Sequence, residues 1–365
     1  MRVAWWLILV GLLAGCGSQE SVRIGFIGGL SGRVSDLGIG GRNGVQLAVD
    51  LRNAAGGING RKVELLTEDD KQDPEAAKAA MARLIERKPV ALIGPMTSSM
   101  ALAVLPQADA ANLLMISPTV TTNTLTGKDD SFFRVVSPTR NLAHVSADYL
   151  ATRKGVRRVV AIFDIRNRAY TEDWLNDFRA ALEARGGKVV ETIDFASSDT
   201  VHFAELAKRL LSARPDCILT LANSVDTAML LQQVRKLDSA VLIAGSEWAA
   251  TERLVELAGQ SAEGFVASQF YDRQGLQPAF VSFRKAFLER FGMEPGFAGT
   301  TGFDAANVLL DALTKQSSSL SLKQVLLSGQ PFNGAQSPVV FDVNGDVARP
   351  TFVTTIRDGR FILSD

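Results

Sequence analysis

A short run of serine and threonine follows one predicted strand, in a position where it could bind a carboxylate. The strand at 90–93 ends in a Gly-Pro turn, and residues 97–99 (Thr-Ser-Ser) then lead into the next predicted helix. Free N–H groups and the positive end of that helix favour an anion, and the hydroxyl of Ser98 stands beside its own N–H. Spacing alone supports a second interpretation equally well, in which these residues only cap the helix.

Polar residues also follow two other predicted strands. Thr119 and Thr121 come after the strand at 113–117, and Glu247 comes after the strand at 240–244. Ligands of open α/β sheets bind beyond the carboxyl ends of the strands, so these side chains are candidates for ligand contact. Two alternatives stay open. The threonines could form a polar surface loop, and Glu247 could cap a following helix.

Motifs for enzyme catalysis are absent from the sequence. The two histidines, His144 and His202, have no serine or cysteine motif beside them, and there is no G-x-S-x-G, HExxH or paired-cysteine metal spacing. The glycine-rich region 25–44 lacks both G-x-G-x-x-G after a strand and the G-x-x-x-x-G-K-[ST] phosphate loop, so we interpret its glycines as turns. We therefore expect a binding protein, without a metal or a cofactor, rather than an enzyme.

The first sixteen residues have the pattern of a targeting segment. Arg2 precedes an apolar run at 3–12, and Leu-Ala-Gly then leads directly into Cys16. The run is shorter than the roughly 20 residues of a spanning helix, and L-A-G-C resembles a bacterial lipobox. We expect 1–16 to be a lipoprotein signal peptide, with Cys16 lipidated after cleavage and the protein anchored in the periplasm or on the outer face of the cell envelope. An ordinary secretory peptide is the alternative.

Composition limits the remaining possibilities. Roughly 350 residues are more than one core comfortably fills, so we expect two domains. Lysine plus arginine and aspartate plus glutamate number 39 each, and this zero net charge argues against nucleic acid as a partner. The second cysteine, Cys217, lies in an apolar run and is expected to be a buried small hydrophobic residue.

Short apolar runs alternate with longer helical patterns along the chain, and the rhythm restarts after a break near Pro138. Predicted strands lie at 22–27, 63–67, 89–93, 113–117, 158–163, 188–195, 217–221 and 240–244, and predicted helices at 43–53, 74–86, 99–110, 172–185, 203–213, 226–237, 278–291 and 303–314. The tail adds strand-like pieces at 338–341, 351–357 and 360–363. This pattern predicts an α/β protein with two doubly wound, Rossmann-like parallel sheets.

The order of short motifs resembles the type I periplasmic binding proteins, and in particular the leucine/isoleucine/valine-binding group. The similar segments are 23–70, 93–99, 116–121, 302–305, 332–334, 340–346 and 358–361. The resemblance implies two lobes joined by three hinge strands, with crossovers near 138–141, 268–272 and 345–350. Lobe 1 would then comprise 22–138 plus 272–347, and lobe 2 would comprise 139–271 plus 348–365.

The resemblance also implies a binding site. Ser98, the backbone of Thr119 and the hydroxyl of Thr121 would bind the ligand on one lobe, while Val120 and Thr122 point away. On the other lobe, Tyr170 would form an aromatic wall and Glu247 would bind an ammonium group. Further candidates are Ser99, Asn223 and Trp248. A carboxylate facing N–H donors suits an α-amino acid zwitterion.

These inferences predict a monomeric substrate-binding component that delivers an amino acid to ABC permease subunits. Alternatives are a ligand sensor on the same fold, a lipoprotein that tethers a cell-wall partner, and binding of amides, urea-like molecules or aromatic acids. The loop at 164–170 departs from the family pattern, because Thr171 stands where glycine usually follows the tyrosine. Arg166 and Arg168 in this loop could reach a ligand carboxylate or simply be solvated.

Overall fold

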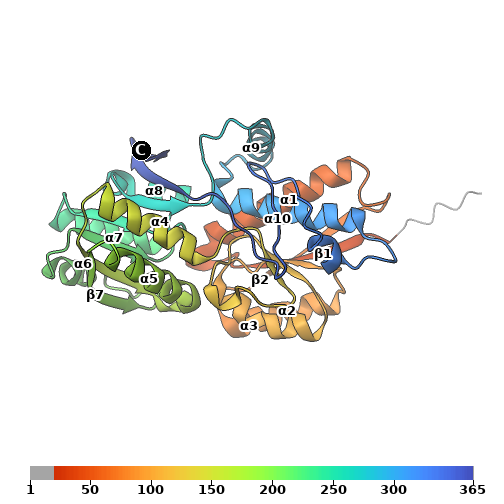
Figure 1. The fold of residues 1–365 in the computed structure, drawn as a ribbon, viewed down its shortest axis with the longest axis horizontal. Helices are drawn as coiled ribbons and strands as arrows, with labels where there is room; N and C mark the ends of the chain where they lie inside the picture. Colours follow the sequence, from red (N-terminus) through yellow and green to blue (C-terminus); the bar gives the residue numbers. More distant parts are fainter. Residues whose placement is uncertain (1–19, 365) are drawn as a thin grey trace, which may run out of the picture.

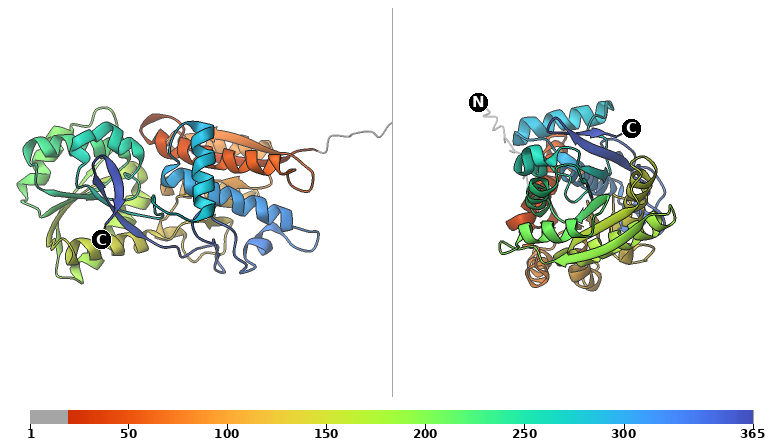
Figure 2. Two further views of the ribbon diagram at one scale, coloured as in Figure 1. Left: turned by 90° about the horizontal axis from the view of Figure 1, so that it is seen from above. Right: turned by 90° about the vertical axis from the view of Figure 1, so that its left-hand side faces the viewer.

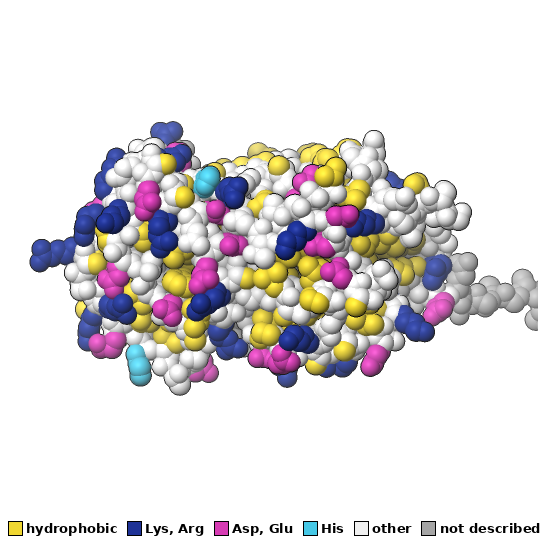
Figure 3. All heavy atoms as spheres, turned by 60° about the horizontal axis from the view of Figure 1, so that its bottom comes forward, with side chains coloured by type: hydrophobic (Ala, Val, Ile, Leu, Met, Phe, Trp, Pro, Cys, Tyr) yellow, Lys and Arg dark blue, Asp and Glu magenta, His cyan; other side chains and the backbone are white. Residues whose placement is uncertain are grey.

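The chain forms two α/β lobes that lie side by side (Figure 1). The computed structural model describes residues 20–364, so the predicted signal peptide and Cys16 lie outside the described residues. Within that range, no helix is both long and apolar enough to cross a membrane. Acidic and basic side chains are interspersed over the face shown in Figure 3, in keeping with the zero net charge.

Lobe 1 is built on a parallel five-stranded sheet in the order β2-β1-β3-β4-β5. Its strands are β1 (Val22–Gly28), β2 (Val63–Asp69), β3 (Leu92–Ile93), β4 (Met115–Ser117) and β5 (Phe132–Arg134). Its main helices are α1 (Ser35–Ala54), α2 (Pro74–Glu86), α3 (Ser98–Ala110), α9 (Pro278–Phe291), α10 (Gly296–Lys315) and α11 (Leu322–Leu326). Helices α1 and α10 pack together on one face, and α2 and α3 cover the other (Figure 1).

Lobe 2 is built on a seven-stranded sheet in the order β12-β11-β10-β9-β8-β6-β7. Strand β11 pairs antiparallel with both of its neighbours, β10 and β12. Its strands are β6 (Arg158–Asp164), β7 (Lys188–Phe195), β8 (Cys217–Leu221), β9 (Leu242–Gly245), β10 (Val266–Gln269), β11 (Phe352–Arg357) and β12 (Arg360–Leu363). Its helices are α4 (Thr139–Thr152), α5 (Arg168–Glu183), α6 (Phe203–Ser212), α7 (Ser224–Leu237) and α8 (Glu252–Ala258). Helices α4 and α5 cover one face, and α6, α7 and α8 cover the other (Figure 2).

Local sequence signals explain most of these elements. The central strands β1 and β8 are apolar along nearly their whole length, as expected for parallel strands buried on both faces. Helix α2 begins where predicted, because the Asp73 side chain accepts a hydrogen bond from the Ala76 N–H and Pro74 occupies the first turn. Cys217 is fully buried, and burial raises the pKa of its thiol to about 12. The predicted α/β fold with two parallel-sheet lobes is confirmed.

The interpretation of the glycines at 25–44 as turns was wrong for its second half, since α1 begins at Ser35 rather than near 43. The glycines are needed for packing. A Cβ atom on Gly44 would lie 2.1 Å from the carbonyl oxygen of Gly299 in α10, and one on Gly302 would lie 2.4 Å from the Gly41 oxygen. Glycine therefore lets α1 and α10 approach closely, and this tertiary requirement overrides its low helix propensity.

Two further predictions were wrong near the C-terminus. Helix α10 begins at Gly296 rather than near 303, because Thr300 and Thr301 donate their hydroxyls to carbonyls one turn back and so fit inside the helix. The segment 338–341 forms no regular strand and contributes only an isolated bridge between Phe332 and Val339. A turn follows directly, in which the Asp342 side chain accepts from the N–H groups of Asn344 and Asp346.

The chain passes between the lobes three times: between β5 and α4, between β10 and α9, and between α11 and β11. A buried ion pair ties the third connection to lobe 1, since Arg349 Nη1 lies 2.6 Å from Asp304 Oδ2 in α10. The same arginine donates to the carbonyl oxygen of Val135, and its backbone N–H donates to Ser137 Oγ at 2.8 Å. Burial raises the pKa of Asp304, and the Arg349 charge counteracts that rise.

Replacing Arg349 by leucine should lower the free energy of unfolding by about 3 kcal/mol or more, because the Asp304 carboxylate would stay buried without its partner. Arg357→Leu is the matched control, because Arg357 is exposed and forms no ion pair among residues 20–364. Urea denaturation of both variants would measure the effect. Equal losses in the two variants would contradict the assigned role of the ion pair.

Candidate functional site

The two lobes are in contact across the cleft through polar side chains. Asp36 Oδ2 on α1 accepts hydrogen bonds from Ser224 Oγ (2.6 Å) and Thr251 Oγ1 (2.7 Å) of lobe 2. Arg33 Nη2 pairs with Asp226 Oδ1 at 2.5 Å. Other contacts between the lobes join Thr122 and Asn123 to Asp173, Asn123 to Asp177, and Ser99 to Asn167. The structure is therefore a closed clamshell.

A small cavity of about 20 Å³ lies inside the closed cleft. Its walls come from both lobes, and they are Leu37, Met96, Thr97, Ser98, Thr119, Asn167, Tyr170, Glu247, Trp248 and Phe297. A volume of this size holds about one water molecule. Any larger occupant therefore requires movement of the walls or of the lobes.

The turn after β3 leaves a free N–H group at the start of α3. Gly94 has a φ of +107°, and a Cβ there would lie 2.1 Å from the Ile27 oxygen, so the turn requires glycine. Thr97 makes no side-chain capping bond and donates its hydroxyl to Gln72 Oε1 instead. The N–H of Ser98 makes no hydrogen bond within residues 20–364. Capping alone therefore does not account for these residues. Ser98 lines the cavity, and its N–H, unused among residues 20–364, is available to an anion.

The second polar loop is buried rather than exposed. Thr119 lines the cavity and donates its hydroxyl to the Met96 oxygen at 2.5 Å. Thr121 does not line the cavity, but its hydroxyl is fully buried and has no partner among the described residues. Val120 packs in the core, and the Thr122 hydroxyl donates to Asp173 Oδ2. The loop therefore keeps one unused hydroxyl, on Thr121.

Glu247 places a carboxyl group in the cavity wall. It follows β9, is 3% exposed, and its Oε2 atom has no hydrogen-bond partner in the described part of the chain. It caps no helix, since α8 begins five residues later behind Thr251. Burial raises the pKa of Glu247 to about 7, and the nearby Tyr170 hydroxyl and Trp174 N–H offset part of that rise. A buried carboxylate without a cation is unfavourable, so this position favours a positively charged ligand group.

Two aromatic rings close the same side of the cavity. Tyr170 belongs to the first turn of α5 rather than to a loop, and it is 3% exposed. Its ring meets Trp248 edge to face, with centroids 5.8 Å apart. Burial raises the pKa of the Tyr170 phenol. Thr171, in place of the expected glycine, donates its hydroxyl to the Asp164 oxygen and so fixes the start of the helix.

Several candidates from the sequence do not reach the cavity. The Ser99 hydroxyl accepts from the Ala169 N–H across the lobes, and Asn223 caps α7 by accepting from the Asp226 N–H. Arg166 donates to the Gln72 oxygen. Arg168 pairs with Glu172 at the surface. None of these side chains lines the cleft cavity. Ser99 and Arg166 contact the other lobe, Asn223 caps a helix, and Arg168 forms a surface pair within α5.

Sequence reasoning missed four residues that line the cavity: Leu37, Met96, Asn167 and Phe297. Leu37 and Phe297 belong to the packed helices α1 and α10, where apolar residues are expected in any core. Only the fold brings them to the cleft. Within residues 20–364, no group of acids, histidines or cysteines is arranged to hold a metal ion.

Two parallel α/β lobes closed over a small buried site define the two-lobed class of solute-binding proteins. Residues 21–360 match the family model described as periplasmic binding protein, and the chain belongs to this family. Its members bind substrates rather than convert them, and the family named from the sequence motifs is confirmed.

Known relatives cover nearly the whole chain. Leu/Ile/Val-binding protein homolog 3 of Brucella melitensis is 24% identical, over 92% of this chain and 91% of that protein. The leucine binding protein LivK of Thermotoga maritima is 26% identical, with a TM-score of 0.86 over 94% of this chain and 98% of its own. A solute-binding protein of an ABC transporter from R. palustris, in complex with benzoate, is 18% identical (TM-score 0.84, covering 94% of this chain and 95% of its own) and shows the fold alone.

The raised pKa of Glu247 should make the unliganded protein less stable as the pH rises. The unfolded glutamate titrates near its ordinary 4.5 and the folded one near 7, so in this range the folded state holds the extra proton and loses stability with increasing pH. Denaturation midpoints should fall more between pH 5 and 8 in the wild type than in Glu247→Gln. The difference isolates Glu247 from Asp70 and Asp164, whose pKa values burial also raises, to about 6. Identical pH profiles would refute the burial argument.

Proposed function

We propose that this periplasmic binding protein captures an α-amino acid between its lobes and delivers it to an ABC importer. The observation that carries the proposal is that one closed cavity has a group suited to an anion on one lobe and a group suited to a cation on the other. Among residues 20–364, the Ser98 N–H at the start of α3 has no acceptor, and the buried Glu247 carboxyl has no cationic partner. A zwitterion satisfies both. An aromatic acid satisfies only the first, because its carboxylate offers Glu247 nothing.

In this proposal each lobe binds one end of the ligand. The ligand carboxylate accepts from the Ser98 N–H and hydroxyl on lobe 1, and its ammonium donates to Glu247 on lobe 2. The Thr121 hydroxyl has no partner among residues 20–364 but does not line the cavity, so it would reach the ligand only after the cavity wall moves. Thr119 contributes backbone groups, and Tyr170 covers the ligand from lobe 2. Closure is favoured because only the closed form contacts the ligand on both sides. The names of the relatives, which bind leucine, isoleucine and valine, support an amino acid as the ligand.

We further propose that the protein is a monomer, lipid-anchored through Cys16, and active on the outer side of the membrane. We also propose that lobe 1 comprises residues 22–138 plus 272–347 and that lobe 2 comprises residues 139–271 plus 348–365. A ligand sensor on the same fold is the second candidate. Adjacent genes for a permease and an ATPase would favour import over sensing.

Calorimetry with the twenty amino acids, their amides and small carboxylic acids tests the proposal directly. At least one amino acid should bind, and Glu247→Gln should weaken it by about 2 kcal/mol or more, roughly thirtyfold, because the ammonium loses its buried partner. Glu183→Gln, an exposed acid at the end of α5, is the matched control. Binding of a simple acid with no response to any amino acid would overturn the zwitterion proposal.

Trp248 should set the size of the ligand side chain. It follows Glu247 directly and is a bulky part of the cavity wall, and we infer that a large branched ligand side chain would have to displace it. We expect Trp248→Ala to improve binding of leucine relative to alanine by about tenfold, the scale of one or two buried methylene groups. The ratio of the two dissociation constants measures this effect without depending on overall stability. An unchanged ratio would show that Trp248 does not limit the side-chain space.

A further inference from the structure

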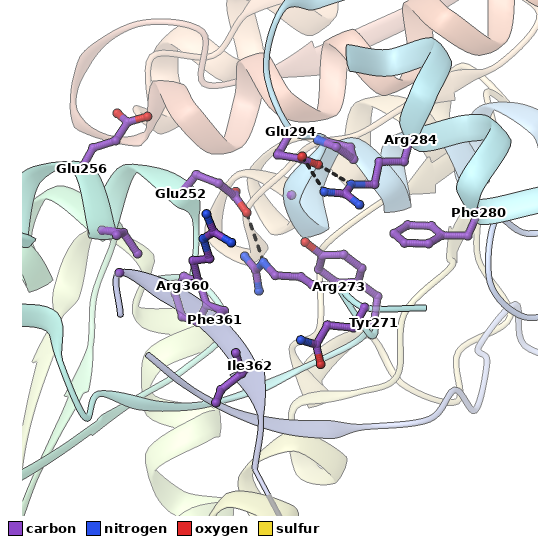
Figure 4. A pocket seen from close by; sticks show the side chains of 15 residues that line it. Glu252, Glu256, Tyr271, Arg273, Phe280, Arg284, Glu294, Arg360, Phe361 and Ile362 are labelled. Carbon is purple, nitrogen blue, oxygen red and sulfur yellow. Dashed lines mark hydrogen bonds and ion pairs between the residues drawn. The ribbon is translucent and has the colours of Figure 1, made fainter. Parts of the chain in front are cut away.

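A second and much larger cavity lies between the lobes, beside the connection that leaves β10. It measures about 660 Å³ and shares no lining residue with the cleft cavity. Lobe 2 contributes α8 and β12, and lobe 1 contributes α9 and residues 294–296. Tyr271, Arg273 and Gln274 of the connecting segment also line the cavity. We call it the hinge-side cavity (Figure 4). Its volume falls in the range of small-molecule sites, roughly 300–1,000 Å³.

We propose that the hinge-side cavity binds a small organic anion with an aromatic or apolar body. This site is separate from the amino-acid site and does not depend on the function proposed above. Its occupant would touch both lobes, so binding would favour one arrangement of the lobes over others.

Three aromatic side chains form part of the cavity wall, each with only a small part of its surface exposed. Tyr271, Phe280 and Phe361 all line the cavity, and the rings of Tyr271 and Phe280 lie 6.2 Å apart at 65°. Arg273 lies over two of these rings, with its guanidinium carbon 4.2 Å from the centre of Phe361 and 5.2 Å from that of Tyr271. The wall is therefore preorganised, because a stacked guanidinium and packed rings have little freedom to lose on binding.

Three acids and three arginines line the cavity, and one of the arginines has no ion-pair partner among residues 20–364. Glu252 pairs with Arg273 at 3.1 Å, and Glu294 pairs with Arg284 at 2.7 Å. The remaining acid, Glu256, pairs with Arg253 outside the cavity. Arg360 on β12 forms no ion pair or side-chain hydrogen bond among residues 20–364, and its guanidinium points into the cavity beside Glu252 and Arg273 (Figure 4).

An unpaired guanidinium at the rim of an aromatic cavity selects an anion over a neutral molecule. The already paired arginines do not provide this preference, since their carboxylate partners cancel their charge. Arg360 is therefore the residue that determines the sign of the ligand charge. The rings determine that the rest of the ligand is apolar.

Fluorescence titration of the full-length protein with 8-anilinonaphthalene-1-sulfonate tests the proposal, with its uncharged analogue N-phenyl-1-naphthylamine as the matched probe. We expect saturable binding of the sulfonate, weakened about fivefold or more by Arg360→Gln, with no change for the neutral probe. Arg357→Gln is the control, because Arg357 lies on the same hairpin but does not line the cavity.

Two further variants locate the site. Val255→Trp fills the cavity from α8 and should weaken both probes, whereas Glu247→Gln alters only the cleft and should change neither. Equal effects of Arg360→Gln and Arg357→Gln would overturn the proposal, as would loss of sulfonate binding in Glu247→Gln. Equal affinity for the charged and neutral probes would also overturn it, by showing an apolar surface without selection for an anion.

Discussion

The burial of one carboxyl group at Glu247 is the constraint on which the site depends. A carboxylate held away from water is stable only when it takes up a proton or meets a cation. The cavity wall at Glu247 includes Ser98 from lobe 1 and Tyr170 and Trp248 from lobe 2, and Glu247 is 3% exposed. Burial raises the pKa of Glu247 to about 7, so protonation is one way to meet this condition, and in the function proposed above the ammonium group of the ligand is the other. Under that proposal, ligand binding releases a proton from this residue.

Packing in lobe 1 and at the connections between the lobes positions the residues that line the cleft cavity. The close approach of α1 and α10 through their glycines places Leu37 and Phe297 at the cleft. The Arg349–Asp304 pair joins α10 to the connections between the lobes. A displacement of α10 would therefore change both the cavity wall and the position at which lobe 2 leaves lobe 1.

Much of the fold could be predicted from the sequence, because buried parallel strands and capped amphipathic helices leave local patterns. Glu247 and Ser98 could be located for a related reason, since residues after strands collect at one edge of a sheet. The start of α1 could not, because its glycines favour turns locally and are helical only through contact with α10. The place of Phe297 in the cleft and the hinge-side cavity could not be predicted from the sequence either. Both depend on segments that are distant in the sequence and meet only in the fold, and no local pattern distinguishes these residues from ordinary core residues.

The hydrogen bonds that Asp36 accepts from Ser224 and Thr251 have a consequence for exchange rates. They lie outside the cleft cavity, together with the Arg33–Asp226 pair, and they must break whenever the lobes separate. These bonds therefore contribute to the barrier for lobe opening by an amount that is the same for every bound molecule. Differences in escape rate between ligands then come from the contacts that each ligand itself makes with the two lobes.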